Sequence, residues 1–556
     1  MKCELKKVKQ YEIAELVFKG GEPEGSAVTV DLQAVFSHGE KAVTVKGFYA
    51  GEGVYKVRFL PEETGTYPYC VTGSVLDGPM KGALEVMPAE EGCHGIVRAN
   101  GTHLQYEDGG WYYPFGTTVY ALMHQSEPLI EETLDTLSKS PFNKIRTCVF
   151  PKHYSYNLNE PANYPFLPKA GAAEKIFSGE GLPVYPQEIK ERDDYWDVHR
   201  PNYVFWDHME KYLLQLQEMG MQIDLILFHS YDRWGFSNLK PEDDLVYLDY
   251  LMRRFAAFPN IWWSLANEYD LCFNKCVEDW EVIEAFVAEH DPYGHLLSNH
   301  NCFKRWDPGR KNITHTSWQS KQFYRISEMM RLYGKPVLID ECRYEGNVPE
   351  VWGNLSGKDM TRNFWRTTVQ GGYCTHGETF LPGTKEGEKA TRTGEKDVVW
   401  WAKGGRLNGE SPARIAFLKE IIESLPGPLE PLNGRSGWFG KDDDEILEIC
   451  AQAQEGFRVF LKRIVWMDQR ERDNFYSVEF QYGGHCDDRA FLYYRDDQCC
   501  AMTDLELPKD HSYQIDVIDT WEMTRKTVLH GASGNVRIQM PGKKYMAVLA
   551  LREDID

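Results

Sequence analysis

Strand patterns and helix patterns alternate eight times between about residue 113 and residue 376. Each strand pattern is a short run of β-branched, aromatic and apolar residues, and several helix patterns end at a glycine or proline, as at Gly220, Pro259 and Gly334. We expect strands at residues 113–120, 143–150, 223–229, 262–268, 296–300, 313–318, 337–341 and 373–376. Eight strands that each lead through a helix to the next are typical of a (β/α)8 barrel, or TIM barrel.

The segments on either side of the predicted barrel have a different pattern. Polar and apolar side chains alternate over short stretches such as 28–34 and 55–59, and the alternation returns at 513–518 after the Pro-Gly-Pro sequence at 426–428. The sequence therefore predicts a multidomain α/β-plus-β protein. Its expected domains are an N-terminal immunoglobulin- or fibronectin-like β-sandwich at 1–95, the barrel at 96–426, and a small C-terminal β-sandwich domain at 427–556.

Composition narrows the possible partners. The formal net charge of −22 argues against nucleic acid and anionic membrane surfaces, because both attract basic proteins. No run approaches the ~18 apolar residues of a transmembrane helix. Residues 1–7 lack the apolar core of a secretory signal, so we expect a cytoplasmic protein. The 13 cysteines follow no disulfide or zinc spacing, so we expect reduced thiols, no metal and no other cofactor.

Two of the predicted strands end abruptly in an acid, Glu268 and Glu341. The carboxyl ends of barrel strands meet at the face that carries active sites, and two carboxylates across one pocket are the minimum machinery for cleaving a glycosidic bond. Asn267, just before Glu268, is a neutral partner for a sugar 2-hydroxyl. For Glu268 the alternative is an acid at a helix N-terminus. For Glu341 the competitors are Asp340 and Glu345, and alternation alone does not tell which strand face points inward.

Other polar and aromatic residues near the predicted strand ends are candidates for substrate contacts. Arg146, on the second strand, could keep Glu341 ionised through a charge-assisted hydrogen bond. The remaining candidates for substrate binding are His229, Asp232, Trp234, His300, Asn301, His315, Trp318, His376, Glu378 and Trp400. The segment 152–201 is too long for an ordinary connection and is rich in aromatic residues, so we expect it to form a wall of the pocket.

Three segments of the chain resemble the apiosidase-like branch of the clan A retaining glycoside hydrolases: residues 113–121, 228–236 and 336–346. The sandwich, barrel and C-terminal β domain together resemble a bacterial subgroup of that branch. The resemblance implies that Glu268 is the acid/base, Asn267 the partner of the 2-hydroxyl and Glu341 the nucleophile. Clan members often place a tyrosine or histidine from strand six near the nucleophile, whereas this strand offers His315, Trp318 and Gln319.

We therefore expect a retaining exo-β-glycosidase that hydrolyses short oligosaccharides or small glycosides by double displacement, with structural flanking domains that could also form a homo-oligomer. Apioside, xyloside, glucoside, galactoside and glucuronide all fit the sequence. One alternative is a metal-dependent barrel hydrolase built on the histidines at strand ends, although the first strand, at 116–118, lacks the usual His-x-His pair. Another is a non-catalytic carbohydrate-binding protein, which loss of either glutamate would have favoured.

Overall fold

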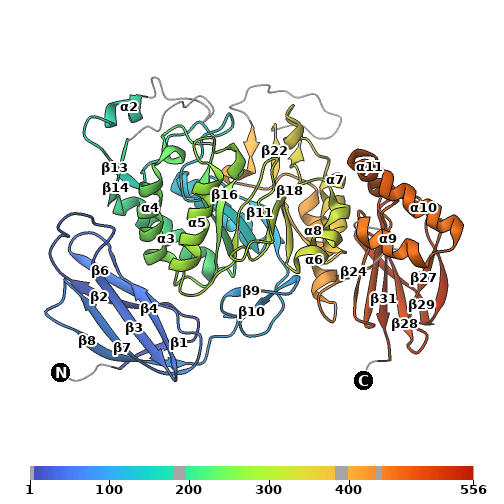
Figure 1. Cartoon of the computed structure of the whole chain (residues 1–556), viewed down its shortest axis with the longest axis horizontal. Coiled ribbons are helices and arrows are strands. Elements are labelled where there is room, and N and C mark those ends of the chain that lie inside the picture. The colour runs from blue at the N-terminus through green and yellow to red at the C-terminus, as the bar shows by residue number, and fades with distance from the viewer. Residues whose placement is uncertain (1–4, 179–194, 382–397, 433–440, 442, 555–556) are drawn as a thin grey trace.

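Eight parallel strands form the central sheet of the protein (Figure 1). A computed structural model describes residues 5–178, 195–381, 398–432, 441 and 443–554. In spatial order the strands are β17 (Leu297–Ser298), β16 (Ile261–Asn267), β15 (Gln222–His229), β12 (Lys144–Cys148), β11 (Phe115–Thr118), β21 (Tyr373–His376), β19 (Val337–Glu341) and β18 (Thr316–Gln319). A hydrogen bond from the Thr314 backbone N–H to the Leu297 carbonyl, at 2.9 Å, joins the two edges. The predicted barrel is confirmed.

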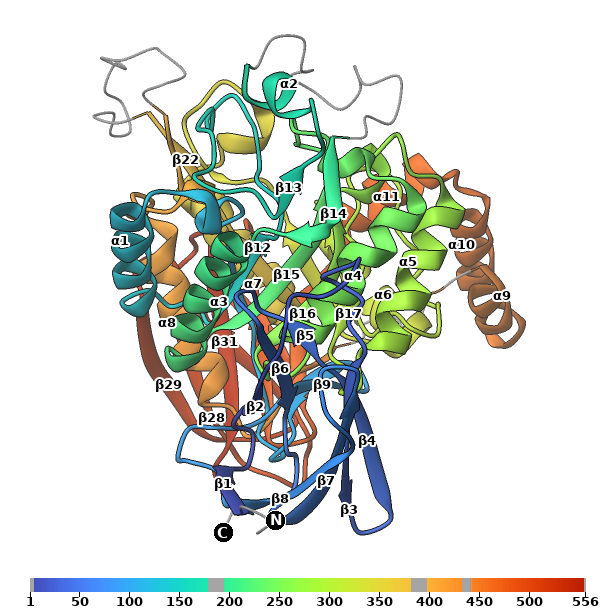
Figure 2. The same cartoon turned by 90° about the vertical axis from the view of Figure 1, so that its left-hand side faces the viewer.

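Helices between the strands cover the outside of the barrel (Figure 2). They are α1 (Glu127–Ser138), α3 (Tyr203–Glu218), α4 (Pro241–Phe255), α5 (Val277–His290), α6 (Ile326–Tyr333), α7 (Gly357–Thr368) and α8 (Ser411–Glu423). Val337 and Ile339 face outward and pack with Phe364 of α7 in one buried apolar cluster. The chain leaves α6 at Gly334, whose φ of 60° is left-handed and therefore suits glycine.

The interior of the barrel is unusually polar. The charged side chains of Lys144, Arg146, Asp224 and Asp340 are fully buried there, where most barrels place branched apolar residues. Lys144 Nζ lies 2.7 Å from Asp340 Oδ1 and 3.2 Å from Asp224 Oδ2, and Arg146 Nε lies 3.1 Å from Asp224 Oδ2. Burial raises the pKa of Asp340, but Lys144 and Arg146 outweigh it and hold that pKa well below its usual range. Asp340 is thus a paired core residue.

The N-terminal residues form two facing sheets that pack against the barrel. One contains β1 (Leu5–Lys9), β8 (Met80–Met87), β7 (Gly65–Gly73), β3 (Leu32–His38) and β4 (Lys41–Lys46), and the other β2 (Ala14–Lys19), β6 (Val54–Phe59) and β5 (Phe48–Tyr49). The buried Arg58 guanidinium donates to Glu210 of α3 (3.0 Å) and to the Arg254 carbonyl of α4 (2.8 Å). These contacts support the sandwich as a structural partner of the barrel. Below the barrel, the hairpin of β9 (Val97–Asn100) and β10 (His103–Tyr106) covers Trp262 and Leu338.

The C-terminal residues form a second β structure with helices that the sequence pattern did not reveal (Figure 1). Its strands are β24 (Glu430–Pro431), β25 (Tyr482–Cys486), β26 (Ala490–Tyr494), β31 (Met546–Arg552), β28 (Tyr513–Asp519) and β29 (Thr524–Ala532), with a separate pair of β27 (Met502–Glu506) and β30 (Asn535–Gln539). The helices are α9 (Asp443–Gln452), α10 (Glu455–Trp466) and α11 (Gln469–Glu479). They bury a small cluster around Leu461 and Ile464.

The long segment after β12 is partly regular. It contains the hairpin of β13 (Phe166–Pro168) and β14 (Trp196–Pro201) and the short helix α2 (Ala173–Ser178). The rest of the predicted wall, residues 179–194, lies outside the described residues. Within the described parts of the chain, every helix is too short or too polar to cross a bilayer.

The interior charge network makes a stability prediction. Lys144→Met removes the ammonium that pairs with Asp340 and leaves that carboxylate uncompensated, so we expect a loss of about 3–5 kcal/mol in the free energy of unfolding. Urea denaturation followed by tryptophan fluorescence measures it. As a control, Lys139→Met breaks an exposed i,i+4 pair with Asp135 and should change stability by less than about 0.5 kcal/mol. Equal unfolding midpoints for the two variants would contradict this account.

Candidate active site

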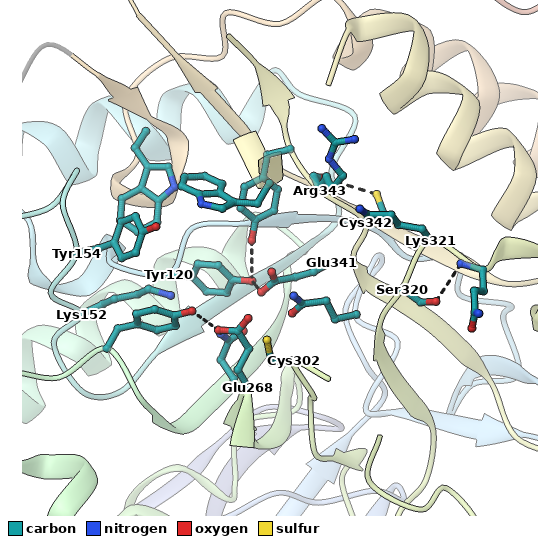
Figure 3. Close-up of a pocket in the computed structure, with 17 residues that line it drawn as sticks. Tyr120, Lys152, Tyr154, Glu268, Cys302, Ser320, Lys321, Glu341, Cys342 and Arg343 are labelled. Carbon is teal, nitrogen blue, oxygen red and sulfur yellow. Dashed lines mark hydrogen bonds between the residues drawn. The ribbon is translucent and has the colours of Figure 1, made fainter. Parts of the chain in front are cut away.

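A pocket of about 580 Å³ opens at the carboxyl ends of the barrel strands (Figure 3). Glu268, Glu341 and Asn267 all line it. Its aromatic lining residues are Tyr120, Tyr154, Tyr231, Tyr344, Trp352 and Trp400. The volume lies within the range of small-molecule sites, and a few polar groups converge in it among aromatic rings.

Glu268 follows β16 directly and has the left-handed backbone conformation, with φ 55° and ψ 57°. Such a conformation is costly for a residue with a side chain and clusters at functional sites. The Tyr231 hydroxyl donates to Glu268 Oε2, and Asn267 Nδ2 lies 3.5 Å from the same oxygen. With the Gln319 amide in the orientation that satisfies its neighbours, its Nε2 donates to Glu268 Oε1 at 3.1 Å. Burial and the neighbouring Glu341 raise the pKa of Glu268 to about 7, which suits a proton donor.

Glu341 reaches the pocket through an irregularity in its strand pairing. Trp318 of β18 pairs with Ile339, whereas the next residue, Gln319, pairs with Glu341, so Asp340 is an extra residue in β19. Such a bulge redirects side chains. Asp340 points into the barrel interior like Leu338, whereas the bulge lets Glu341 line the pocket although Val337 and Ile339 face outward, which answers the question that alternation left open.

The carboxylate of Glu341 accepts one hydrogen bond and has one cation close by. The Tyr120 hydroxyl, just beyond β11, donates to Glu341 Oε1 at 2.5 Å, and Arg146 Nη1 lies 3.8 Å from the same oxygen. Tyr344 places its hydroxyl 3.3 Å from that of Tyr120. Burial and the charge of Glu341 raise the pKa of Tyr120 and Tyr344 well above the usual value, so both phenols remain protonated donors.

Only part of the predicted substrate-binding set lies in the pocket. Besides Asn267, the pocket is lined by Trp400, whose ring centroid lies 5.4 Å from that of Tyr154. The Asn267 Oδ1 atom is buried and has no hydrogen-bond partner among the described residues, so it is available for a sugar hydroxyl. Arg146 lies beneath the pocket and reaches it only through Tyr120 and Glu341.

Three candidates, His229 at the end of β15 and Asp232 and Trp234 in the loop after it, make contacts within that region, and none lines the pocket. His229 Nε2 donates to the Phe150 carbonyl (3.0 Å), while its Nδ1 accepts from the Tyr231 backbone (3.1 Å). Asp232 accepts from the backbone N–H groups of Trp234 (2.7 Å) and Ser237 (2.6 Å). The Trp234 ring is fully buried, and its N–H donates to Glu160. These residues shape the turn that presents Tyr231.

The candidates in and beside β17 and β18 are likewise buried and do not line the pocket. His300 Nδ1 lies 3.4 Å from the backbone nitrogen of Glu268, and Asn301 Oδ1 accepts from the Gln319 backbone (3.3 Å). His315 lies beside Trp262, with ring centroids 5.6 Å apart. Trp318 packs outward in an apolar cluster. The contacts of His300 and Asn301 thus support the backbone of Glu268 and Gln319.

His376, Glu378 and Glu345 form a separate buried group beside the N-terminus of α8. Their potential ligand atoms lie within 4.8 Å of one another, the one such group among the residues that the structure describes. Glu345 accepts from the backbones of Glu410 (2.6 Å) and Ser411 (3.1 Å), and Glu378 accepts from Gly409 (2.9 Å). Burial raises the pKa of Glu378 to about 8 and lowers that of His376 to about 3. None of the three lines the pocket, so Glu345 does not compete with Glu341 for an incoming sugar.

The four histidines at strand ends do not assemble into a metal centre. His229, His300, His315 and His376 are fully buried, and burial lowers the pKa of each. Only His376 belongs to a group with metal-ligand spacing among the described residues. The geometry therefore lends no support to the alternative of a metal-dependent barrel hydrolase.

Comparison with known proteins agrees with the geometry. A family model described as the apiosidase-like catalytic domain matches residues 98–427. The chain belongs to the apiosidase-like family. Its barrel is the catalytic domain of a glycoside hydrolase. Two domain models of unknown function match residues 7–74 and 479–550. Among curated proteins, no sequence matches the chain.

Two solved structures show how far the likeness of this apiosidase-like chain extends. A putative glycoside hydrolase from Bacteroides vulgatus ATCC 8482 is 31% identical, with a TM-score of 0.79, and the match covers 99% of this chain and 100% of the other. A glycoside hydrolase family 5 protein from the same organism is 14% identical, with a TM-score of 0.56, over 83% of this chain and 95% of the other. The second likeness concerns the fold alone.

Several pocket residues of this apiosidase-like barrel were not among the sequence candidates. They are Tyr120, Lys152, Tyr154, Tyr231, Tyr344 and Trp352. Tyr120 and Tyr231 each come two residues after a strand, so their position was a usable signal. The polar histidines nearby were favoured instead, because sequence does not tell which strand-end residue folds back into its own loop.

Glu268 should control the alkaline side of the pH profile. A proton donor must be protonated, so we expect kcat/KM of the apiosidase-like enzyme to fall as pH rises through about 7. The Tyr231 hydrogen bond stabilises the ionised form of Glu268 and lowers its pKa. Tyr231→Phe should therefore move the alkaline limb to higher pH, whereas Tyr333→Phe in α6 should leave it in place. If the alkaline limb of Tyr231→Phe lay at the same or a lower pH than that of the wild-type protein, the result would contradict the assignment of Glu268 as acid.

Proposed function

We propose that the protein is a retaining exo-β-glycosidase in which Glu341 is the nucleophile and Glu268 the acid/base. The observation that carries this proposal is the pairing of two glutamates in one pocket with opposite environments. Glu268 is almost fully buried and has a raised pKa, whereas Glu341 receives a phenol hydrogen bond and lies near a guanidinium. An enzyme can use one carboxyl group as an acid and another as a nucleophile when their environments give them different pKa values.

In the first step, Glu341 attacks the anomeric carbon while Glu268 gives its proton to the departing oxygen. In the second step, Glu268 takes a proton from water, which displaces Glu341 and releases the sugar with its original configuration. The free Oδ1 of Asn267 is placed beside Glu268 and suits the 2-hydroxyl. Loss of that contact would cost up to several kcal/mol of transition-state stabilisation.

A wall of aromatic rings favours attack at the end of a short substrate. Tyr154, from the segment after β12, packs with Tyr231, Trp352 and Trp400 at ring-centroid distances of 5.4–5.8 Å. Such a wall limits the passage of a polymer through the site. We also propose the domain division at residues 1–95, 96–426 and 427–556, with structural roles for both flanking domains.

Replacement of the two acids separates their roles. Glu341→Ala should reduce hydrolysis of aryl β-glycosides by about four orders of magnitude or more. Glu268→Ala should still form the glycosyl-enzyme from glycosides with acidic leaving groups but hydrolyse it about 10²–10⁴-fold more slowly. Azide should then restore turnover of Glu268→Ala and give a β-glycosyl azide.

The control is Glu40→Ala, which removes an exposed acid of the N-terminal sandwich and should leave turnover unchanged. Near-normal activity of Glu341→Ala would remove Glu341 as nucleophile. An α-glycosyl azide from the Glu268 variant would instead reverse the two assignments. Absence of turnover in the wild-type protein with every glycoside, together with sugar binding, would favour a carbohydrate-binding protein.

A further inference from the structure

Lys152 places an ammonium inside the pocket, beside the two acids. It is the fourth residue beyond the end of β12, and it lines the cavity (Figure 3). Its Nζ lies 4.0 Å from the ring centroid of Tyr231, 4.3 Å from that of Tyr120 and 5.8 Å from that of Trp400. The residue as a whole is only 4% exposed. The aromatic faces hold the cation in position but use none of its N–H donors.

The other buried lysines of the described chain differ from Lys152 in one respect. Lys144 pairs with Asp340 at 2.7 Å, and Lys275 pairs with Asp244. Among the described residues, no acceptor lies within hydrogen-bond or ion-pair distance of the Lys152 ammonium. Glu268 and Glu341 act on it only through space, where their charges oppose the lowering of its pKa by burial. A buried charge without a direct partner is expensive, so its persistence needs a reason.

The pocket already contains neutral groups that suit neutral sugar hydroxyls. Asn267 and Gln319 line it, and both carry amide groups. A site for a purely neutral sugar does not require an added ammonium, whereas a carboxylate is the acceptor with which an ammonium makes its strongest hydrogen bonds. Two more basic residues, Lys321 and Arg343, lie along the same lining. With Lys152, the lining carries three basic residues and two glutamates, whereas the whole chain has a net charge of −22.

We propose that the glycoside bound in this pocket carries a carboxylate, as a uronic acid does, and that Lys152 is the counter-ion of that carboxylate. This inference rests on the proposed glycosidase function and names its class of substrate. The competing role for Lys152 is to balance the charge of Glu341 alone. In that case acidic and neutral sugars would bind equally well, so a comparison of matched sugars separates the two roles.

Isothermal titration calorimetry on the full-length protein at neutral pH tests the binding directly. The ligands are two pairs that differ in a carboxylate at one carbon: glucuronate with glucose, and galacturonate with galactose. We expect at least one uronate to bind about tenfold or more tightly than its neutral partner. Lys152→Met should erase that preference while it keeps the affinity for the neutral sugar, and Lys139→Met, far from the pocket, should keep both.

The wild-type comparison alone can overturn the inference, even if Lys152→Met fails to fold. The inference is overturned if both uronates bind no more tightly than their neutral partners. It is also overturned if Lys152→Met still prefers a uronate over its neutral partner. Turnover of the matching aryl β-glycosides separates this result from the proposed function. Preferred hydrolysis of the neutral glycosides would reject the acidic substrate and leave the glycosidase intact. Lysine-dependent uronate binding without hydrolysis of any glycoside would reject the glycosidase and leave the binding site.

Discussion

The buried guanidinium of Arg146 joins the charged interior of the barrel to the floor of the pocket. It lies 3.1 Å from Asp224 Oδ2, 3.2 Å from the Tyr120 hydroxyl and 3.8 Å from Glu341 Oε1. Because these groups are shielded from water, their mutual attraction is stronger than at a surface. The interior network thereby fixes Tyr120, which in turn fixes Glu341. Catalytic geometry here is continuous with the packing of the barrel, and it depends on an ion-pair network where most barrels have apolar layers.

The two carboxyl groups proposed as catalytic influence each other through the same low-polarity environment. The negative charge of Glu341 adds to burial in raising the pKa of Glu268. Lys152 and the Tyr231 phenol oppose that rise. In the proposed mechanism, this helps Glu268 to lose its proton once Glu341 is bonded to sugar. The left-handed backbone at Glu268 and the bulge at Asp340 are the local irregularities that aim the two acids. The proposed catalytic residues therefore lie where regular strand geometry stops.

Residue patterns predicted the barrel because buried parallel strands and amphipathic helices have distinct periods. Glu268, Glu341 and Asn267 became candidates because they stand at predicted strand ends, and all three line the pocket. Trp400, a candidate from the loop after the eighth strand, lines it as well. His229 stands at such an end as well, but its ring nitrogens are taken by its own loop. The local sequence pattern does not predict that a strand-end side chain will hydrogen-bond to neighbouring backbone groups. Helices α9–α11 were missed because their apolar residues bury one small cluster within a region that alternates elsewhere. The position of Lys152 depends on aromatic rings from three separate segments, which no local pattern shows.

Trapping of the covalent intermediate tests the central claim most directly. A 2-deoxy-2-fluoro β-glycoside with an acidic leaving group, matched to a sugar that the enzyme hydrolyses, should slow the second step and leave the sugar bonded to the protein. Peptide mass spectrometry then locates the label. The account predicts one label on Glu341 and its absence in Glu341→Ala. A label on Asp340, Glu345 or Glu268, or turnover of the fluorinated substrate with inversion and no adduct, would contradict it.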